Sequence, residues 1–482
     1  MASLTTLGDE ALIALDTLAG RAGGLITPTL RLGVTGLSRA GKTVFITALV
    51  HNLIHGGRLP LFEAQKSGRI ARAALGDQPD DNVPRFQYED HVAALVEHRE
   101  WPDSTRAVSQ LRLLIEYESA SGWGRLFSRG TLALDVVDYP GEWLLDLPLL
   151  GKDYATFSAE AAEMAILPVR ADLSAAWREL AAACDPDAPA DETTARNLAE
   201  SYTAYLRACK HGDRALSTLP PGRFLMPGDL DGSPALTFSP LSSLADAPAK
   251  SGSLRAMMER RFEAYKTHVI RPFFREHIAR LDRQIVLIDA MQALNAGRDA
   301  VADLERSLTE IMACFRQGRS NLLTGLFARR IDRVLIAATK ADHLHHEGHE
   351  RLQAIVRRLA ERAAARASFS GADVEALAMA AVRATREGTV SQGRETLPVI
   401  IGTPIKGETI DQETFDGETE TAIFPGDLPA NASAVLKEGV PPLRFVKFRP
   451  PRIERTADGV ALSLPHIRLD RALQFLIGDH LA

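Results

Sequence analysis

The residues best suited to chemistry lie near the start of the chain, in the stretch Gly36–Thr43, GLSRAGKT. It fits G-x-x-x-x-G-K-[ST], the loop that wraps the phosphates of a nucleotide. Glycines let the backbone curl so that its N–H groups point inward, and the N-terminus of a following helix attracts the same anions. The alternative is a glycine turn that happens to carry a lysine. We expect Lys42 to reach the β- and γ-phosphates and Thr43 to ligate Mg²⁺. The predicted phosphate-binding residues are Gly36, Ser38, Arg39, Ala40, Gly41, Lys42 and Thr43.

A second candidate site is DYPG, residues 138–141, at the end of an apolar run. An aspartate there fits the metal-side Asp of P-loop enzymes, so we expect Asp138 to hold Mg²⁺ and the Gly141 N–H to bond the γ-phosphate. Glu142 stands where Ras-like GTPases carry a water-orienting Gln. A carboxylate facing a γ-phosphate predicts slow hydrolysis. The alternative is that Glu142 points to solvent and no group orients water until a partner binds.

The motif TKAD, residues 339–342, follows the apolar run VLIAA and has the pattern that reads guanine in P-loop GTPases. The Asp342 carboxylate would accept two hydrogen bonds that adenine does not offer. We expect the stem of Lys340 to cover one face of the base and Thr339 to tie this loop to the phosphate loop. The alternative is a strand end with a solvated lysine and a helix-capping aspartate.

Two further predictions concern the base and the terminal phosphate. Val382 and Arg383 follow the last predicted strand, where a backbone N–H could reach the guanine oxygen and Arg383 could cover the ring. Thr105, in WPDSTRAVSQ, is the candidate switch threonine that contacts Mg²⁺ and the γ-phosphate, with Ser104 and Ser109 as competitors. The predicted catalytic residues are Glu142, Lys42 and Thr105, the predicted metal ligands are Thr43, Thr105 and Asp138, and the candidate arginine fingers are Arg39, Arg99 and Arg106.

Three other clusters could bind something else. His345 and His349, four residues apart, would suit a metal on a helix face, although a surface helix start is the plainer interpretation. Residues 123–127, WGRLF, and the basic stretch 316–330 could contact a membrane or a partner, although a loop that covers its own base and a solvated loop and helix are the plainer interpretations.

The elements that must position these residues alternate between strand and helix patterns. A strand precedes the phosphate loop and a helix follows it, and two runs joined by a polar loop predict a hairpin. Strand and helix patterns return after a long helical stretch, which favours one parallel sheet with an inserted helical domain. The predicted strands cover residues 29–35, 108–117, 131–138, 283–290, 332–342 and 373–385, and the predicted helices include 44–55, 86–99, 299–316 and 349–367.

Composition limits the class of protein. The chain has 482 residues, of which 45% are hydrophobic and 24% charged, so we expect a globular protein of two or three domains. Its net charge of −6 makes a general nucleic-acid binder an unlikely class. Three widely spaced cysteines suit a reducing cytosol, and no apolar run is long enough to predict a membrane span.

We therefore expect an α/β fold: a Ras-like P-loop nucleotide-binding domain with an inserted helical domain and a C-terminal β-rich module. In the last part, LPVIIGTPI, LRFVKFRPP and GVALSLP predict short strands. The predicted boundaries are an N-terminal helix in 1–24, a discontinuous core in 25–150 and 283–387, a helical insertion in 151–282, a β-rich module in 388–467 and a C-terminal helix packing on the core in 468–482.

Several long motifs resemble the YcjX-like proteins of Gram-negative bacteria. They are GRFLMPGDLDGSP (222–234), FFREHIARLDRQIVLIDAMQALNAG (273–297) and RIDRVLIAATKADHLHH (330–346). The resemblance covers nearly the whole chain and implies a cytosolic P-loop NTPase associated with stress response and the phage-shock response, and linked to a membrane-protein neighbour. That family is often labelled an ATPase, although its nucleotide motifs resemble those of Ras-like GTPases. The family pattern matches in place at Gly36, Lys42, Thr43, Asp138, Gly141, Lys340 and Asp342.

The functional hypothesis is a stress-related switch that binds Mg²⁺ and GTP and hydrolyses GTP slowly to GDP. We expect residues 56–107 and 139–150 to change conformation with the nucleotide and so alter binding of an unidentified protein partner, which could be an inner-membrane protein. The expected location is cytoplasmic, with peripheral attachment to the inner membrane as an extension. The alternatives are an ATPase of the same fold and a nucleotide-stabilised scaffold with negligible turnover.

Overall fold

A computed structural model gives the structure of most of the chain. It describes residues 27–37, 40–103, 107–120, 130–211, 214–242, 244, 246–314, 331–368, 371–392, 395–437, 440–441, 443–456 and 463–482. Several of the predicted features lie outside these ranges, namely the N-terminal helix in 1–24, Ser38, Arg39, Ser104, Thr105, Arg106, and the stretches 123–127 and 316–330.

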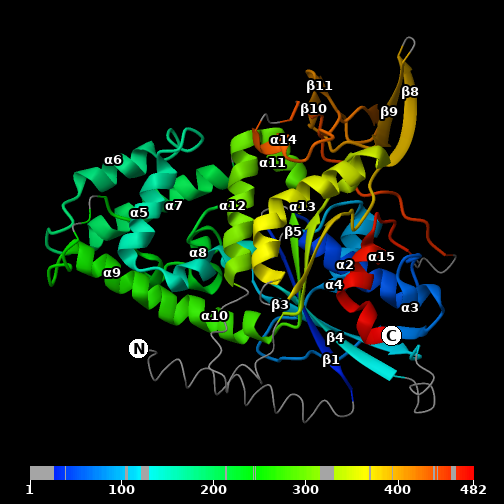
Figure 1. The fold of residues 1–482 in the computed structure, drawn as a ribbon, viewed down its shortest axis with the longest axis horizontal. Coiled ribbons are helices and arrows are strands. Elements are labelled where there is room, and N and C mark those ends of the chain that lie inside the picture. Colours follow the sequence, from blue (N-terminus) through cyan, green and yellow to red (C-terminus); the bar gives the residue numbers. More distant parts are fainter. Residues whose placement is uncertain are drawn as a thin grey trace.

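The centre of the described part is a seven-stranded, mostly parallel sheet (Figure 1). Its order is β2-β3-β4-β1-β5-β6-β7, with β4, β1, β5, β6 and β7 parallel and β2 and β3 antiparallel to their neighbours. The predicted α/β class is confirmed. The strands are β1 (Thr29–Gly36), β2 (Ile70–Leu75), β3 (Ser109–Tyr117), β4 (Gly130–Asp138), β5 (Arg283–Ile288), β6 (Arg333–Ala338) and β7 (Asp373–Ala378).

Helices cover both faces of the sheet, and the alternation of side chains along each strand decides which face they meet. In β5, Ile285 and Leu287 pack with one face cluster, and Val286 and Ile288 with the other. Parallel strands covered on both sides need such continuous apolar runs. The helices α2 (Lys42–Ile54) and α15 (Leu469–Ile477) cover the first face, and α12 (Arg298–Cys314) and α13 (His346–Ser368) cover the second.

A group of helices extends sideways from the second face, and we call α5 to α10 the helical region (Figure 1). Its core is continuous with the sheet, since one apolar cluster runs from Val286 and Ile336 to Phe238 and Tyr202. The predicted insertion is therefore packed on the sheet as well as inserted in the chain. Its helices are α5 (Tyr154–Ala165), α6 (Ala175–Ala183), α7 (Glu192–His211), α8 (Gly222–Leu225), α9 (Leu254–Tyr265) and α10 (Arg271–Glu276), and α11 (Ala290–Ala296) precedes α12.

Strands near the C-terminus form two small antiparallel sheets. These are β12-β9-β8 and β10-β11, drawn above the main sheet in Figure 1. The run LRFVKFRPP is not a strand: within it the described residues pair only at one isolated bridge, Pro404 with Phe448. In the run GVALSLP (459–465), residues 459–462 lie outside the described ranges. The strands are β8 (Arg386–Gln392), β9 (Glu395–Gly402), β10 (Thr409–Ile410), β11 (Glu413–Thr414) and β12 (Thr421–Ile423), and α14 (Ala434–Lys437) follows them.

The polar stretch after the first helix holds an edge strand that the sequence did not predict. Strand β2 pairs with β3, and its sequence IARAAL is rich in alanine, a weak strand former. The same stretch contains α3 (Glu63–Lys66) and α4 (Tyr88–Ala93), the latter continued by one π-helical turn over Ala94–His98. The predicted helix at 86–99 thus begins and ends close to its expected bounds.

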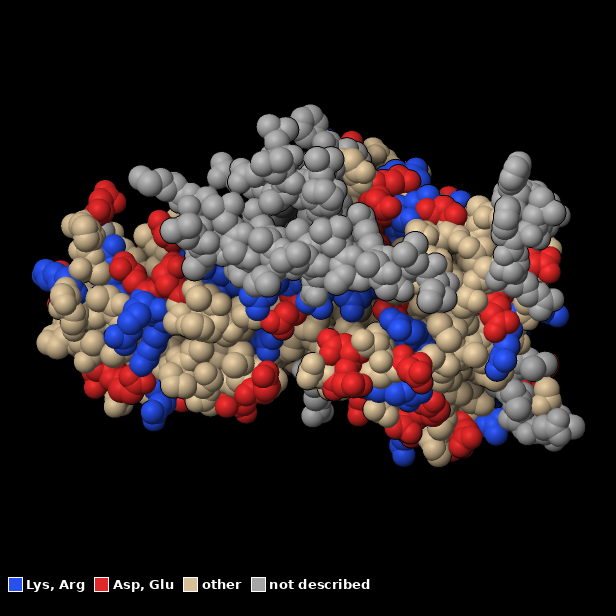
Figure 2. Space-filling model, turned by 90° about the horizontal axis from the view of Figure 1, so that it is seen from below, with Lys and Arg blue, Asp and Glu red and all other residues tan. Residues whose placement is uncertain are grey.

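The outer surface carries mixed charge. Figure 2 shows one face, on which acidic and basic side chains of the described residues are interspersed. Within the described ranges, no helix combines the length and the apolar character needed to cross a bilayer.

Candidate nucleotide site

The predicted phosphate loop joins β1 to α2 at the carboxyl edge of the sheet, where open α/β sheets bind ligands. Gly41 has a left-handed backbone (φ 76°), a conformation that favours glycine, and it caps α2. The Ala40 N–H donates to the Leu37 carbonyl over 3.0 Å. A Cβ on Gly36 would lie 2.9 Å from Lys42 Cγ, so the lysine stem crosses directly over this glycine. The loop thus brings Gly36, Ala40, Gly41 and Lys42 together.

The D-x-x-G residues meet the phosphate loop from the neighbouring strand. Asp138 is the last residue of β4 and lies in register with Val34, two residues before Gly36. Gly141 then packs so closely on Gly36 that a Cβ there would overlap the Gly36 carbonyl oxygen. Only glycine fits this approach, which places the Gly141 N–H beside the phosphate loop.

Oxygen ligands suited to Mg²⁺ gather next to this junction. The Thr43 hydroxyl donates to the Asp103 carbonyl over 3.2 Å, and Asp138 is 1% exposed. Burial lowers the pKa of His91, and the charges of Asp90, Asp138 and Asp103 oppose that shift, so Asp138 and Asp103 both lie within electrostatic range of this ring. Hydroxyl and carboxylate oxygens are the ligands that Mg²⁺ prefers, so these residues fit the ion.

Glu142 faces a lysine of the helical region rather than solvent. Its Oε1 atom lies 2.8 Å from Lys210 Nζ on α7, and the two side chains are 12% and 10% exposed. Burial raises the pKa of Glu142, but the charge and hydrogen bond of Lys210, with the charge of Lys42, outweigh burial and hold the pKa below its usual value. Sequence reasoning missed Lys210, because no local motif marks a lysine on a distant amphipathic helix.

The segment after Gly141 is a 3₁₀ helix over Gly141–Gly151 and is largely buried. Its Asp146 accepts hydrogen bonds from the Gly222 N–H (2.7 Å), the Arg223 N–H (3.2 Å) and the Tyr265 hydroxyl (2.8 Å). Burial raises the pKa of Asp146 to about 7, although these hydrogen bonds oppose the shift. Residues 139–150 were predicted to change conformation with the nucleotide. Because this segment is packed into the helical region, such a movement would involve both parts.

At the other end of the site, Asp342 is fixed by backbone contacts. It is 4% exposed, and its Oδ2 atom accepts the Ala384 N–H over 2.9 Å. The Thr385 hydroxyl donates to the Asp342 carbonyl, and the Ala341 N–H donates to Met379 over 3.1 Å. The carboxylate predicted to read guanine is therefore oriented before any base binds.

Thr339 and Lys340 contact β5 and the residue that follows it. The Thr339 hydroxyl donates to the Ile288 carbonyl over 3.2 Å, so its described contact is with the end of β5 and not with the phosphate loop. Lys340 has a left-handed backbone, and its ammonium pairs with Asp289. This pairing holds the lysine stem in one direction, as covering a base requires.

The structure gives Val382 and Arg383 other partners than those expected. Val382 is buried in the face cluster of α2 and α15, and the Arg383 N–H donates to the Pro465 carbonyl over 2.6 Å. The Arg383 guanidinium donates to the Thr385 carbonyl and to Glu387. Ala384 and Thr385, the next two residues, contact Asp342 and follow a strand shorter than the sequence predicted. The expected contacts of Val382 and Arg383 with guanine remain predictions.

A C-terminal segment, residues 443–452, contacts residues 99–101, which precede the candidate switch threonine in the sequence. The Trp101 indole N–H donates to the Phe448 carbonyl over 2.6 Å, and Arg99 donates to the Pro450 carbonyl over 3.1 Å. Arg99, one candidate arginine finger, thus bonds a carbonyl of this segment; Arg39 and Arg106 lie outside the described residues.

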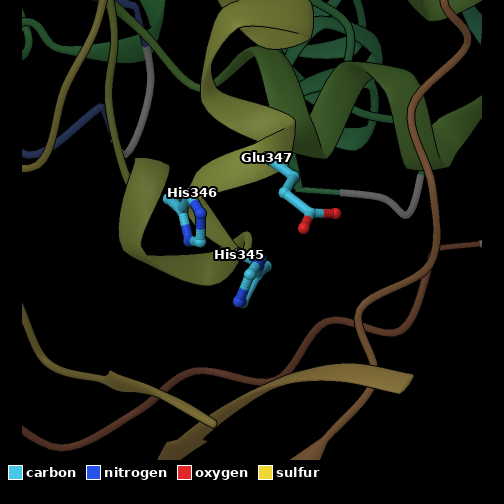
Figure 3. Close-up of side chains that lie close together, drawn as sticks. All are labelled: His345, His346 and Glu347. Atoms are coloured by element: carbon cyan, nitrogen blue, oxygen red, sulfur yellow. The ribbon is translucent and has the colours of Figure 1, made fainter. Parts of the chain in front are cut away.

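One of the two histidines considered as metal ligands, His349, has another partner. His349 is buried, and its Nε2 atom lies 3.3 Å from the Leu344 carbonyl oxygen. Ligand atoms of His345, His346 and Glu347 instead lie within 4.8 Å of one another at the start of α13 (Figure 3). Because His346 and Glu347 are exposed, and His346 already bonds Glu387 over 2.8 Å, we interpret this cluster as a solvated helix start.

Comparisons with known proteins agree with this arrangement. The family model described as "YcjX-like family, DUF463" matches residues 30–481. A relative named "Ras-like GTPase YcjX" from Escherichia coli (strain K12) is 39% identical over 465 residues, covering 94% of this chain and 96% of the relative. A relative of the same name from Shewanella oneidensis is 35% identical over 471 residues, covering 94% of each chain.

Proposed function

Since the chain belongs to the YcjX-like family, as its motifs suggested, we propose that it is a guanine-nucleotide-binding GTPase that hydrolyses GTP slowly with Mg²⁺. The observation that supports the proposal is that two pairs of motif residues make close contacts where the phosphates and the base would bind. Gly141 closes on Gly36 at the phosphate end, and Ala384 orients Asp342 at the base end.

The phosphate end supports triphosphate binding with a metal. Lys42 would pair with the β- and γ-phosphates, and the Gly141 N–H would donate to the γ-phosphate. Thr43, Asp138 and Thr105 would hold Mg²⁺, which when bound neutralises charge on the β- and γ-phosphates. In hydrolysis the water oxygen bonds to the γ-phosphorus and the bond from that phosphorus to the β–γ bridging oxygen breaks. GDP keeps the bridging oxygen, and the inorganic phosphate takes both protons of the water as H₂PO₄⁻.

The base end favours guanine over adenine. A buried carboxylate that meets adenine is left without the two donors it needs, which costs affinity. Ala384 supplies one N–H to Asp342 and leaves the carboxylate lone pairs that guanine would use.

Turnover is expected to be slow. Glu142 replaces the usual water-orienting amide, and its negative charge stands next to a negatively charged phosphate. We extend the proposal, on family resemblance alone, to a stress-related switch in the cytoplasm with a protein partner at the inner membrane.

Competition binding tests the base preference. A fluorescent GDP analogue is bound to the full chain with Mg²⁺ and displaced by GTP or by ATP. We expect GTP to displace it at a concentration at least about 100-fold lower than ATP does. Equal displacement by ATP would favour the ATPase alternative. Lys42→Ala is the control and should retain no probe.

Single-turnover hydrolysis then separates a slow enzyme from a scaffold. We expect GTP bound to the protein to be hydrolysed faster than free GTP and only with Mg²⁺. A rate equal to that of free GTP would support the nucleotide-stabilised scaffold instead.

A further inference from the structure

The helical region contributes a charged residue to the phosphate end of the site. Lys210 lies near the C-terminal end of α7, and its ammonium is 2.8 Å from the Glu142 carboxylate. Both side chains are nearly buried, so this contact is screened much less by water than a surface ion pair. It joins a residue of the helical region to the residue that directly follows D-x-x-G.

The backbone of Glu142 has little freedom to move away from the phosphates. On one side Gly141 packs against Gly36 of the phosphate loop. On the other side, a Cβ on Gly222 would overlap the Glu142 carbonyl oxygen, so α8 closes on the same residue. In this structure the backbone of Glu142 is thus held between two close glycine contacts, which keeps its carboxylate beside the predicted phosphate site.

A carboxylate at this place needs a counter-charge. In the structure the positive charges of two lysines stabilise the Glu142 carboxylate: Lys210 by direct contact, and Lys42 more weakly. When a nucleotide is bound, the Lys42 ammonium would pair with the phosphates and would stabilise Glu142 less. Lys210 is then the cation that remains to neutralise Glu142. A γ-phosphate adds negative charge beside this carboxylate, so the demand for Lys210 is greater with a triphosphate than with a diphosphate.

We propose that Lys210 is a positioning residue of the nucleotide site, which neutralises Glu142 and thereby allows this buried carboxylate to stand beside the terminal phosphate of a triphosphate. The proposal rests on the proposed function in one respect, that the ligand is a nucleoside triphosphate. It assigns the helical region a part in distinguishing triphosphate from diphosphate, because Lys210 can serve Glu142 only while α7 stays in place.

The test is the ratio of triphosphate to diphosphate affinity, measured by equilibrium competition on the full chain with Mg²⁺. The competitors are a non-hydrolysable GTP analogue and GDP. We expect Lys210→Met to lower this ratio at least about tenfold, because the γ-phosphate then faces an unpaired carboxylate. Arg207→Met, an exposed residue one turn earlier on α7, is the matched control and should leave the ratio unchanged.

A double variant separates positioning from direct contact. Lys210→Met with Glu142→Gln removes the unpaired charge, so we expect the ratio to return to within about threefold of the wild-type value. If the ratio stays low in the double variant, Lys210 binds the phosphate itself and the proposal is wrong. If Lys210→Met, folded as judged by circular dichroism, leaves the ratio unchanged, the ion pair is only structural and the proposal is also wrong.

The same titrations with ATP and ADP keep the two claims apart. Base preference, GTP against ATP, tests the proposed function. The triphosphate-to-diphosphate ratio can be measured with either base and tests Lys210. If the protein prefers ATP but Lys210→Met loses the triphosphate preference, the proposed guanine specificity is wrong and the role of Lys210 is supported.

Discussion

The base end and the phosphate end of the site are held by different kinds of contact. At the proposed base end, the loop with Asp342 is fixed mainly by hydrogen bonds that involve the backbone, those of the Ala384 and Thr339 N–H groups. The Lys340–Asp289 ion pair of the same loop orients the lysine. At the phosphate end, Glu142 and Asp146 are fixed by side chains and loops of the helical region, chiefly Lys210 and Tyr265.

The difference indicates which end can respond to the nucleotide. Backbone hydrogen bonds between neighbouring strand ends do not depend on the charge of a ligand, so the base end is pre-organised. An ion pair beside the phosphates does depend on that charge. The helical region therefore contacts the proposed site at its phosphate end, through Lys210 of α7, Gly222 of α8 and Tyr265 of α9.

The largest expected effect comes from breaking the phosphate end at its closest approach. Gly141→Ala would place a Cβ against the Gly36 carbonyl oxygen. The phosphate loop and the D-x-x-G segment must then separate by an ångström or more, and we expect nucleotide affinity to fall by about 100-fold. Titration with a fluorescent GDP analogue measures this loss.

Gly348→Ala is the matched control for that change. A Cβ at Gly348 in α13 would lie 3.4 Å or more from its neighbours, an ordinary contact. We expect unchanged affinity and stability equal to or above the wild type. Equal affinities of Gly141→Ala and Gly348→Ala would show that the close approach is not needed for binding.

An effect of intermediate size concerns pH. The folded pKa of Asp146 is about 7 against an ordinary value of 3.8, so between these values only the unfolded chain loses its proton. Stability from this group is fully present below about pH 4 and is lost as pH rises toward 7, by no more than about 1.4 kcal/mol per pH unit. Chemical denaturation from pH 4 to 8 should show the wild type losing stability relative to Asp146→Asn.

The control for the pH series is Asp231→Asn, an exposed carboxylate that follows the 3₁₀ turn Gly228–Leu230. It should track the wild type at every pH. A constant difference between the wild type and Asp146→Asn over this range would mean that Asp146 does not titrate there.

The smallest effect is expected at the base end. Because the Arg383 guanidinium bonds Thr385 and Glu387, Arg383→Ala should change GDP affinity by less than about threefold. Arg386→Ala, an exposed arginine nearby, is its control. A tenfold loss in Arg383→Ala alone would return this side chain to the face of the base, as the sequence first suggested.

Local patterns predicted the fold class and the position of each motif well. Gly36–Thr43, Asp138 and Asp342 all follow apolar strands, and a strand followed by a short loop is encoded within about ten residues. The family resemblance is confirmed by a family match over residues 30–481. The roles of the individual site residues remain predictions.

Contacts between distant parts of the chain could not be predicted in this way. Lys210 meets Glu142 only after α7 has packed on the sheet, and β2 forms from IARAAL only because β3 offers an open edge. The contact that holds Asp342 was not predicted either, because β7 ends at Ala378 and the chain then turns toward Pro465 before Ala384 reaches Asp342. The periodicity of apolar residues does not predict the path of the chain between Ala378 and Ala384.

The most direct test of the central claim is a change of base specificity in Asp342→Asn. The asparagine oxygen can still accept the Ala384 N–H, so the loop is preserved, while its NH₂ group would donate to the C2 carbonyl of xanthine. Competition between GDP and XDP for the purified variant measures the outcome. The account predicts that Asp342→Asn prefers XDP while the wild type prefers GDP. An unchanged preference for GDP in a folded Asp342→Asn would contradict it.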